Sequence, residues 1–400
     1  MSYPWQLIGL LWMVAFLNSA DRSVIFAVMP QLRTEFQLTD TQLALISSVF
    51  FWIYAIAAFL SGRLSDTARR STVVVGGLAF WSVATGVASL STGFAMFIAL
   101  RGFVALGEST YYPAATALIS DWHTRAMRSR ALSLHQTGVF AGAGLGGYIA
   151  GEIADRFGWR IPFVVFGGGG LLLAAVLRKL LRDRPVERSA APPKTNGRLL
   201  GPSALMLCVV FFLCNGAATG ITVWAPTYVH DVMGTNLGSS ALYGAASINL
   251  AGFLAVPFGG LLADWLAGRS AIGRFYALII GLGIAAVCLV PFALAKSAPM
   301  VGVVLLCSSI GKGLFDGCIY AAMHDVVPPQ ARATAVGLMT MLGFFGAGLM
   351  PLLVARSASL FGMAAGLASL AVLYFVAVGI LLATRGATRT AVLQTRQLEA

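Results

Sequence analysis

Long apolar stretches, separated by short polar ones, run along most of this 400-residue chain. A helix that crosses a bilayer needs about 20 mostly apolar residues. Backbone polar groups in lipid must be satisfied within the segment itself, which favours helices. The pattern therefore predicts an all-α membrane protein with twelve transmembrane helices. The predicted spans are residues 5–29, 43–62, 72–91, 94–119, 131–154, 160–181, 202–226, 241–263, 272–294, 298–323, 333–355 and 360–383.

One long polar stretch interrupts this pattern between the sixth and seventh spans. It runs from Arg182 to Arg198 and combines prolines with charges, which is typical of a linker. The helices therefore divide six plus six. The predicted domains are an N-terminal bundle over residues 1–182, a cytoplasmic linker over 183–200, a C-terminal bundle over 201–384 and a cytoplasmic tail over 385–400.

The composition agrees with a membrane location and explains the charge. Hydrophobic residues make up 58% of the chain and charged residues 10%, whereas soluble domains carry about 25% charged residues. The net charge is +12, and 19 of the 27 Lys and Arg residues fall on one side of the predicted membrane, against five on the other. By the positive-inside rule both termini are expected to be cytoplasmic. The basic charge thus follows from topology, and no nucleic-acid partner is expected.

Residues that would support an enzyme are missing from the pattern. The five cysteines lie in apolar segments without metal-ligand spacing, and the four histidines are scattered. No nucleophile elbow or glycine-rich phosphate loop is present. We therefore expect no enzyme, no metal site and no cofactor. The first apolar segment is long and charged at its centre, so no cleavable signal peptide is expected.

The two halves of the chain repeat one another. The segment 121–131 aligns with 325–335 at an offset of 204, and 62–66 aligns with 260–264 at an offset of 198. Asn18 in the first span corresponds to Asn215 in the seventh. Parallel six-helix repeats are typical of a transporter that rocks around a site near the middle of the membrane.

The loop after the second span resembles the signature of the major facilitator superfamily: a glycine, three residues, an aspartate and a basic cluster. The resemblance implies that these loops latch the two halves in one state of the transport cycle; simple topogenic charge is the alternative. The first copy lacks the second glycine and one position of the usual pattern. The candidate gating residues in the two copies are Gly62, Asp66, Arg69, Arg70, Asp264 and Arg269.

Narrower similarity is found in residues 17–22, 101–108 and 157–160. Together these segments resemble the anion:cation symporter family, which imports organic anions, often sugar acids, with protons. Spinster lipid transporters share the Asp-Arg of the first span and the Arg and Glu of the fourth. The sequence leaves both families open.

Six ionisable residues lie well inside predicted spans. On insertion scales each costs roughly 2.5–3.5 kcal/mol at a helix centre, so they are expected to face one another or a water-filled cavity. These residues are Asp21, Arg22, Arg101, Glu108, Lys312 and Asp316.

The four charges in the first half form the main candidate site. Arg101 and Glu108 are almost two turns apart and share one face of a helix, about 10 Å apart in height. Asp21 and Arg22 point about 100° apart, so one faces a cavity while the other leans towards a neighbouring helix. Burial favours a protonated carboxyl and a nearby arginine favours the ionised one. This competition suits Asp21 and Glu108 to carry protons and Arg22 and Arg101 to bind a substrate carboxylate; the symporter resemblance implies the same roles for Asp21, Glu108 and Arg22. A static ion-pair network is the alternative.

The second half holds a different pair. Lys312 and Asp316 are four residues apart on one helical face, so they can neutralise each other. The repeat offset places Lys312 at the position of Glu108. A static pair and a substrate contact are equally compatible with the sequence.

Several neutral side chains are softer candidates for substrate contacts. Tyr54 and Gln136 resemble substrate-contacting residues of the symporter family, and Asn215 and Asn249 add amide groups in the seventh and eighth spans. For each of them a helix–helix hydrogen bond is the alternative. His135 beside Gln136 is either part of this set or an interfacial residue.

These features predict a proton-coupled symporter for a small organic anion, such as a sugar acid or another carboxylate, that works by alternating access. A Spinster-like lipid or lysolipid transporter is the alternative. The expected partners are the organic anion, protons and membrane lipid, and a monomer in a bacterial cytoplasmic (inner) membrane is expected.

Overall fold

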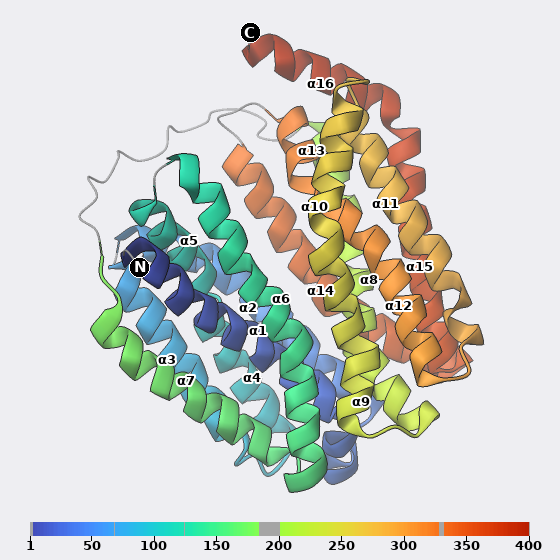
Figure 1. The fold of residues 1–400 in the computed structure, drawn as a ribbon. Coiled ribbons are helices and arrows are strands. Elements are labelled where there is room, and N and C mark those ends of the chain that lie inside the picture. The colour runs from blue at the N-terminus through green and yellow to red at the C-terminus, as the bar shows by residue number, and fades with distance from the viewer. Residues whose placement is uncertain (1–2, 68, 124, 184–200, 328–331, 400) are drawn as a thin grey trace. The chain divides into compact units, whose positions relative to one another are not determined.

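A computed structural model describes residues 3–67, 69–123, 125–183, 201–327 and 332–399. All regular elements in these ranges are helices, which confirms the predicted all-α class (Figure 1). In chain order the first helices are α1 (Tyr3–Phe36), α2 (Asp40–Thr67), α3 (Arg70–Ala88), α4 (Phe94–Glu108), α5 (Tyr111–Trp122), α6 (Arg125–Phe157) and α7 (Arg160–Leu180). They are followed by α8 (Pro202–Met233), α9 (Leu237–Ala241), a π-helical turn (Leu242–Ala246), α10 (Ser247–Ala267), α11 (Gly273–Leu289), a 3₁₀ turn (Val290–Leu294), α12 (Ala298–Asp316), α13 (Ile319–Val326), α14 (Arg332–Phe361), α15 (Met363–Ala383) and α16 (Arg385–Glu399).

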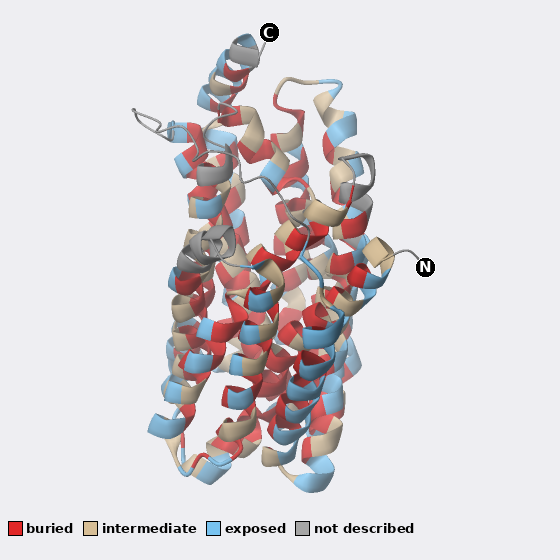
Figure 2. Cartoon of the chain, turned by 90° about the vertical axis from the view of Figure 1, so that its left-hand side faces the viewer, coloured by how far each residue is buried: buried red, intermediate tan, exposed pale blue. Residues whose placement is uncertain are grey.

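Ten helical segments of the described chain are long and apolar enough to cross a membrane. They coincide with ten of the predicted spans. The fourth and fifth predicted spans fall on α4, α5 and α6, which are not among the ten. Large apolar side chains remain exposed along the helices, for example Phe258 and Val303, and the burial pattern alternates accordingly (Figure 2). Such exposure is expected where lipid is the solvent.

The described chain divides into two compact units. Unit 1 contains Met1–Ser189 and Ala225–Ala246, and unit 2 contains Ala190–Trp224 and Ser247–Ala400. Residues 225–246 group with unit 1 because α9 is held to α6: the Asp155 carboxylate accepts hydrogen bonds from the backbone nitrogens of Leu237 and Gly238, both at 3.1 Å. Most of the predicted linker lies outside the described residues. The predicted domain boundaries remain a prediction.

Small residues bring helices of each unit into backbone contact. In unit 1 a Cβ added to Gly142 of α6 would lie 2.0 Å from the carbonyl oxygen of Phe16 in α1. In unit 2 a Cβ added to Gly346 of α14 would lie 2.4 Å from the carbonyl oxygen of Phe212 in α8. Close approach of this kind is how membrane helices gain packing energy without a hydrophobic driving force. The same helix pair of each repeat uses it.

Two predicted spans are broken rather than continuous. The span 94–119 ends as α4 at Glu108 and resumes as α5. Pro113 has no N–H for the carbonyl of residue 109 and its ring would clash there, and the Ser109 hydroxyl donates to the Leu106 carbonyl at 2.8 Å. The span 298–323 also breaks, after Asp316, which is four residues beyond the position equivalent to Glu108. Each break therefore directly follows a charged residue of the candidate site.

Candidate functional site

Helix α1 of unit 1 directs Arg22 towards α4. Its Nε donates to Oε2 of Glu108 at 2.6 Å, and its Nη2 donates to Oδ1 of Asn18 at 2.5 Å. The Glu108 side chain is fully buried, whereas the Arg22 side chain retains 21% of its exposure. This is a charge-assisted hydrogen bond, which is stronger than a neutral one. The predicted pairing of an acid and a base between the first and fourth spans is therefore present.

The other two charges of the quartet have no such partner. Asp21 is buried and accepts a hydrogen bond from Thr85 of α3 at 3.3 Å, while its Oδ1 has no hydrogen-bond partner. Arg101 is buried on the same helix as Glu108, and its Nε also lacks a partner. Among the described residues Arg101 forms no ion pair. The quartet thus combines one ion pair, Arg22–Glu108, with an acid and a base, Asp21 and Arg101, that each have a buried atom without a hydrogen-bond partner.

Two aromatic rings of α2 cover the arginines. The Arg22 guanidinium lies 4.8 Å from the centroid of the Tyr54 ring, and that of Arg101 lies 4.7 Å from the Phe50 ring. These distances fit cation–π contacts, which stabilise a guanidinium without neutralising it. Sequence reasoning proposed Tyr54 and missed Phe50; the spacing of four residues between two aromatic side chains was the available signal.

Helices α5 and α6 are joined by two parallel side-chain contacts. The Tyr112 hydroxyl donates to Gln136 at 2.9 Å. The Tyr111 hydroxyl donates to the Leu11 carbonyl at 2.6 Å and meets Nε2 of His135 at 2.6 Å. His135 is 1% exposed, so it is a buried residue.

In unit 2 the predicted pair of α12 is present. Nζ of Lys312 lies 2.6 and 2.7 Å from the two carboxylate oxygens of Asp316. Asn215 of α8 donates to the Gly343 carbonyl of α14 at 3.0 Å, which is a helix–helix contact. Asn249 is half-buried on α10.

The candidate gating residues occupy matched places in both units. Arg70, at the start of α3, pairs with Asp121 of α5. In unit 2, Arg274 pairs with Asp325 at 2.6 Å and with Asp264 at 3.1 Å. Both pairs, Arg70–Asp121 and Arg274–Asp325, span 51 residues along the chain.

Two other gating candidates are placed differently, and two more are not described. Arg69 is exposed just before α3. Arg269 stands over the Trp265 ring at 3.5 Å instead of pairing with an acid. The side chains of Gly62 and Asp66 lie outside the described residues. Sequence reasoning missed Arg274, although its offset of 204 from Arg70 equals that of the two aspartates.

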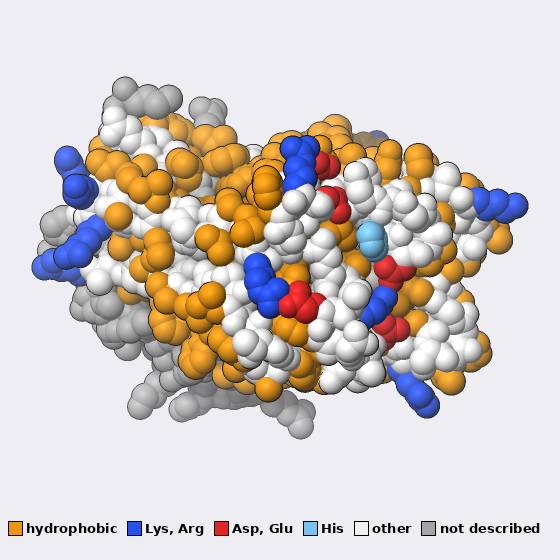
Figure 3. Space-filling view, turned by 90° about the horizontal axis from the view of Figure 1, so that it is seen from below, with side chains coloured by type: hydrophobic (Ala, Val, Ile, Leu, Met, Phe, Trp, Pro, Cys, Tyr) orange, Lys and Arg blue, Asp and Glu red, His pale blue; other side chains and the backbone are white. Residues whose placement is uncertain are grey.

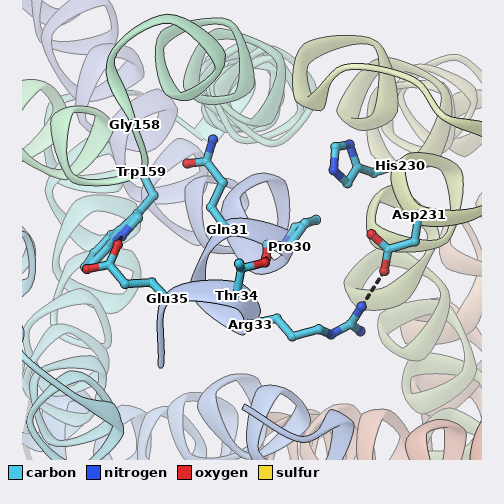
Figure 4. Close-up of a pocket in the computed structure, with 9 residues that line it drawn as sticks. All are labelled: Pro30, Gln31, Arg33, Thr34, Glu35, Gly158, Trp159, His230 and Asp231. Carbon is cyan, nitrogen blue, oxygen red and sulfur yellow. Dashed lines mark hydrogen bonds and ion pairs between the residues drawn. The ribbon is translucent and has the colours of Figure 1, made fainter. Parts of the chain in front are cut away.

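A further cavity that the sequence did not indicate opens at the far end of α1. It has a volume of about 650 Å³, and acidic and basic side chains and a histidine lie on the face seen in Figure 3. Arg33 pairs there with Asp231 (Figure 4). It also pairs with Asp40 at 2.7 Å. Glu35 pairs with Arg160 at 2.6 Å. The cavity is lined by Pro30, Gln31, Arg33, Thr34, Glu35, Gly158, Trp159, His230 and Asp231.

Metal-binding groups do not assemble in the described part of the chain. No three His, Cys, Asp or Glu side chains there are placed to hold an ion. The carboxylates of the site are groups that can bind protons, and its guanidinium and ammonium groups are ones that can bind anions.

Comparison with known proteins identifies relatives of this chain. The model of the family described as "Major Facilitator Superfamily" matches residues 11–351. A hexuronate transporter of Bacillus subtilis (strain 168) is 26% identical over 394 residues, covering 92% of this chain and 93% of that protein. Protein spinster of Drosophila melanogaster is 27% identical over 362 residues, covering 84% of this chain and 59% of that protein. The crystal structure of a bacterial homologue of the human lysosomal transporter Spinster, inward-facing and unoccupied, superimposes with a TM-score of 0.85 at 20% identity, covering 99% of this chain and 98% of that one.

Proposed function

Because the chain belongs to the Major Facilitator Superfamily, we propose that this integral membrane protein is a secondary active transporter that carries a small organic anion together with protons by alternating access. The substrate class is a carboxylate such as a sugar acid. The similarity to a hexuronate transporter supports this class. A half-buried arginine on α1 and a buried one on α4 supply the matching chemistry.

The observation that carries the proposal is the ion pair between Arg22 and Glu108. A proton that binds Glu108 neutralises the carboxylate and leaves Arg22 with an unpaired guanidinium. That forked group suits a substrate carboxylate. Asp21 is the second proton carrier, because it is a buried carboxyl that lies close enough to Arg101 to interact with it electrostatically. Anion binding and protonation then favour each other.

The remaining candidates have supporting roles in this proposal. The amide and phenol groups of Tyr54, Gln136, Asn215 and Asn249 contact the neutral part of the substrate. Lys312 and Asp316 are further substrate contacts. The gating set latches alternate states of the cycle, with the Arg70 and Arg274 pairs as its described parts; Gly62, Asp66, Arg69, Asp264 and Arg269 belong to the same motif.

The membrane arrangement is part of the proposal. The charge bias favours twelve spans with both termini in the cytoplasm. We propose a bacterial cytoplasmic membrane and a monomer.

Binding is tested first with purified protein and four sugar acids: glucuronate, galacturonate, gluconate and galactonate. A ligand at 100 times its Kd stabilises the folded state by about 2.7 kcal/mol, which thermal unfolding detects. We expect at least one acid to stabilise the protein, and Arg22→Ala to remove the effect. Arg156→Ala is the matched control, since that arginine is 72% exposed on α6. No stabilisation by any acid, or equal stabilisation of the Arg22 variant, contradicts the proposal.

Transport is then tested in liposomes with the acid that binds. We expect accumulation that follows an inward proton gradient and stops when a protonophore is added. Accumulation that ignores the gradient contradicts proton coupling.

A Spinster-like lipid transporter is the second candidate, favoured by the similarity to Protein spinster. Stabilisation by lysolipids alone, unchanged in the Arg22 variant, would support it and make Arg22 a structural partner of Glu108.

A further inference from the structure

Helix α12 of unit 2 is fixed in rotation by close contacts on two flanks. A Cβ added to Gly311 would lie 2.4 Å from a backbone nitrogen of α11, and one added to Gly317 would lie 2.2 Å from a backbone oxygen of α10. Successive residues of a helix are 100° apart, which places Lys312 and Asp316 between these flanks. Ile310, on the other side of α12, is exposed. The pair therefore faces the interior of unit 2.

Lys312 and Asp316 bind each other. Lys312 is buried and bonds both oxygens of Asp316, whose side chain retains 37% of its exposure. Among the described residues neither forms another ion pair. A lysine has three N–H donors, so one remains for another acceptor.

Among the described residues, the other titratable groups that interact with Asp316 are thiols and phenols. Asp316 interacts electrostatically with the thiol of Cys214 in α8 and with the phenol of Tyr374 in α15. Tyr320 of α13 and Cys318 at the break complete the set. Helices α10 and α11 contact α12 through small residues and backbone atoms. Their nearest charged residues belong to the cluster of Arg274, Asp264 and Asp325 described above.

The order of the two residues is unfavourable for a purely structural pair. Within a helix an acid four residues before a base is the stabilising arrangement, and here the base comes first. Asp316 is also the last residue of α12, where the helix dipole disfavours a negative charge. A buried pair is weak as a source of stability in any case. The helix itself therefore contributes little to holding this pair together.

We propose that Lys312 binds a carboxylate group of the transported anion, and that Asp316 occupies Lys312 as an internal substitute while the protein is ligand-free. A proton from water binds the Asp316 carboxylate to give the neutral acid, the Lys312 ammonium keeps its charge, and the ligand carboxylate takes the vacated place. Release reverses these steps and returns the proton. The inference rests on the proposed function, because that function supplies the anion; it adds one further proton that binds with the substrate.

The test measures binding of the sugar acid that stabilises the wild-type protein most. Calorimetric titrations in two buffers of different ionisation enthalpy give the affinity and the number of protons taken up per anion. We expect Lys312→Gln to weaken binding more than tenfold, as truncation of a buried charge partner does. Asp316→Asn should take up one proton fewer than wild type and bind more tightly at neutral pH, because the internal competitor is gone.

Two further variants separate binding from folding. The double variant Lys312→Gln/Asp316→Asn has no buried charge left unpaired, so it should recover thermal stability and still bind weakly. Glu152→Gln breaks the exposed pair with Arg156 on α6, which has the same four-residue spacing, and should leave affinity and proton count unchanged.

The outcomes distinguish this inference from the proposed function. Unchanged affinity in Lys312→Gln together with an unchanged proton count in Asp316→Asn makes the pair static and overturns the inference, while loss of binding in Arg22→Ala still upholds the proposed function. A wild-type protein that binds none of the acids refutes the proposed function, and the inference with it.

Discussion

Replacing Glu108 with glutamine removes one buried charge and keeps the shape of the side chain. Its Oε2 accepts the hydrogen bond of Arg22 at 2.6 Å, and glutamine retains an acceptor at that position. The other oxygen, Oε1, is buried without a partner, so the new amide nitrogen breaks no existing bond. The variant is therefore expected to fold, and its main effect is on the state of Arg22.

The size of that effect follows from the hydrogen bond. Bonds to charged groups contribute about 1.5–3 kcal/mol and neutral ones about 0.5–1.5 kcal/mol, so the substitution weakens the hold on Arg22 by roughly 1 kcal/mol. The Arg22 side chain keeps 21% of its exposure. Because solvent screens a partly exposed pair, we take the energy difference from the lower part of this range. Since 1.4 kcal/mol is tenfold, we expect anion binding at neutral pH to tighten by about fivefold.

The transport assay separates coupling from binding. In Glu108→Gln no proton can leave this position, so accumulation driven by a proton gradient should be lost. Counterflow exchanges labelled for unlabelled anion without net proton movement, and it should persist. Glu152→Gln, a carboxylate of α6 outside the quartet, should keep both activities. Undiminished proton-driven accumulation in Glu108→Gln would refute the reasoning.

Two further predictions concern the helix contacts and the matched ion pairs. Gly142→Ala places a methyl group 2.0 Å from the Phe16 carbonyl and should lower stability by about 1–3 kcal/mol, seen as a lower unfolding temperature; Gly168→Ala has open space around it and is the control, and equal effects would mean that α1 and α6 do not limit stability. Among the described residues Asp121 is the carboxylate that pairs with Arg70, so Asp121→Asn removes that ion pair. Asp325→Asn leaves Arg274 paired with Asp264. We expect the first to lower the unfolding temperature more than the second, with a difference of about 0.5–1 kcal/mol, and the reverse order would contradict the pairing.

Much of the fold could be predicted because it depends on local pattern. Apolar stretches of about 20 residues fix where helices lie when lipid is the solvent. Helical period alone placed Lys312 and Asp316 on one face. It also separated Asp21 from Arg22, which turn to α3 and α4 respectively.

The hydropathy pattern did not predict where a helix is interrupted by a side chain that competes for its backbone hydrogen bonds. The fourth predicted span is continuous in hydropathy, but Pro113 and the hydroxyl of Ser109 interrupt its backbone bonds and end α4 at Glu108. Hydropathy averages over such positions, because one hydroxyl or one missing N–H hardly changes a window of 20 residues.

The sequence by itself determined the helices, the two repeats and the set of charges that must meet inside the membrane. Only the tertiary structure decided which charges meet: Glu108 takes Arg22, Arg101 is left over the Phe50 ring, and Arg274 joins two aspartates. The physical reason is range. A helix fixes the direction of each side chain through its own backbone, whereas an ion pair needs two atoms within about 4 Å, and that distance is set by how closely helices far apart in the chain can approach.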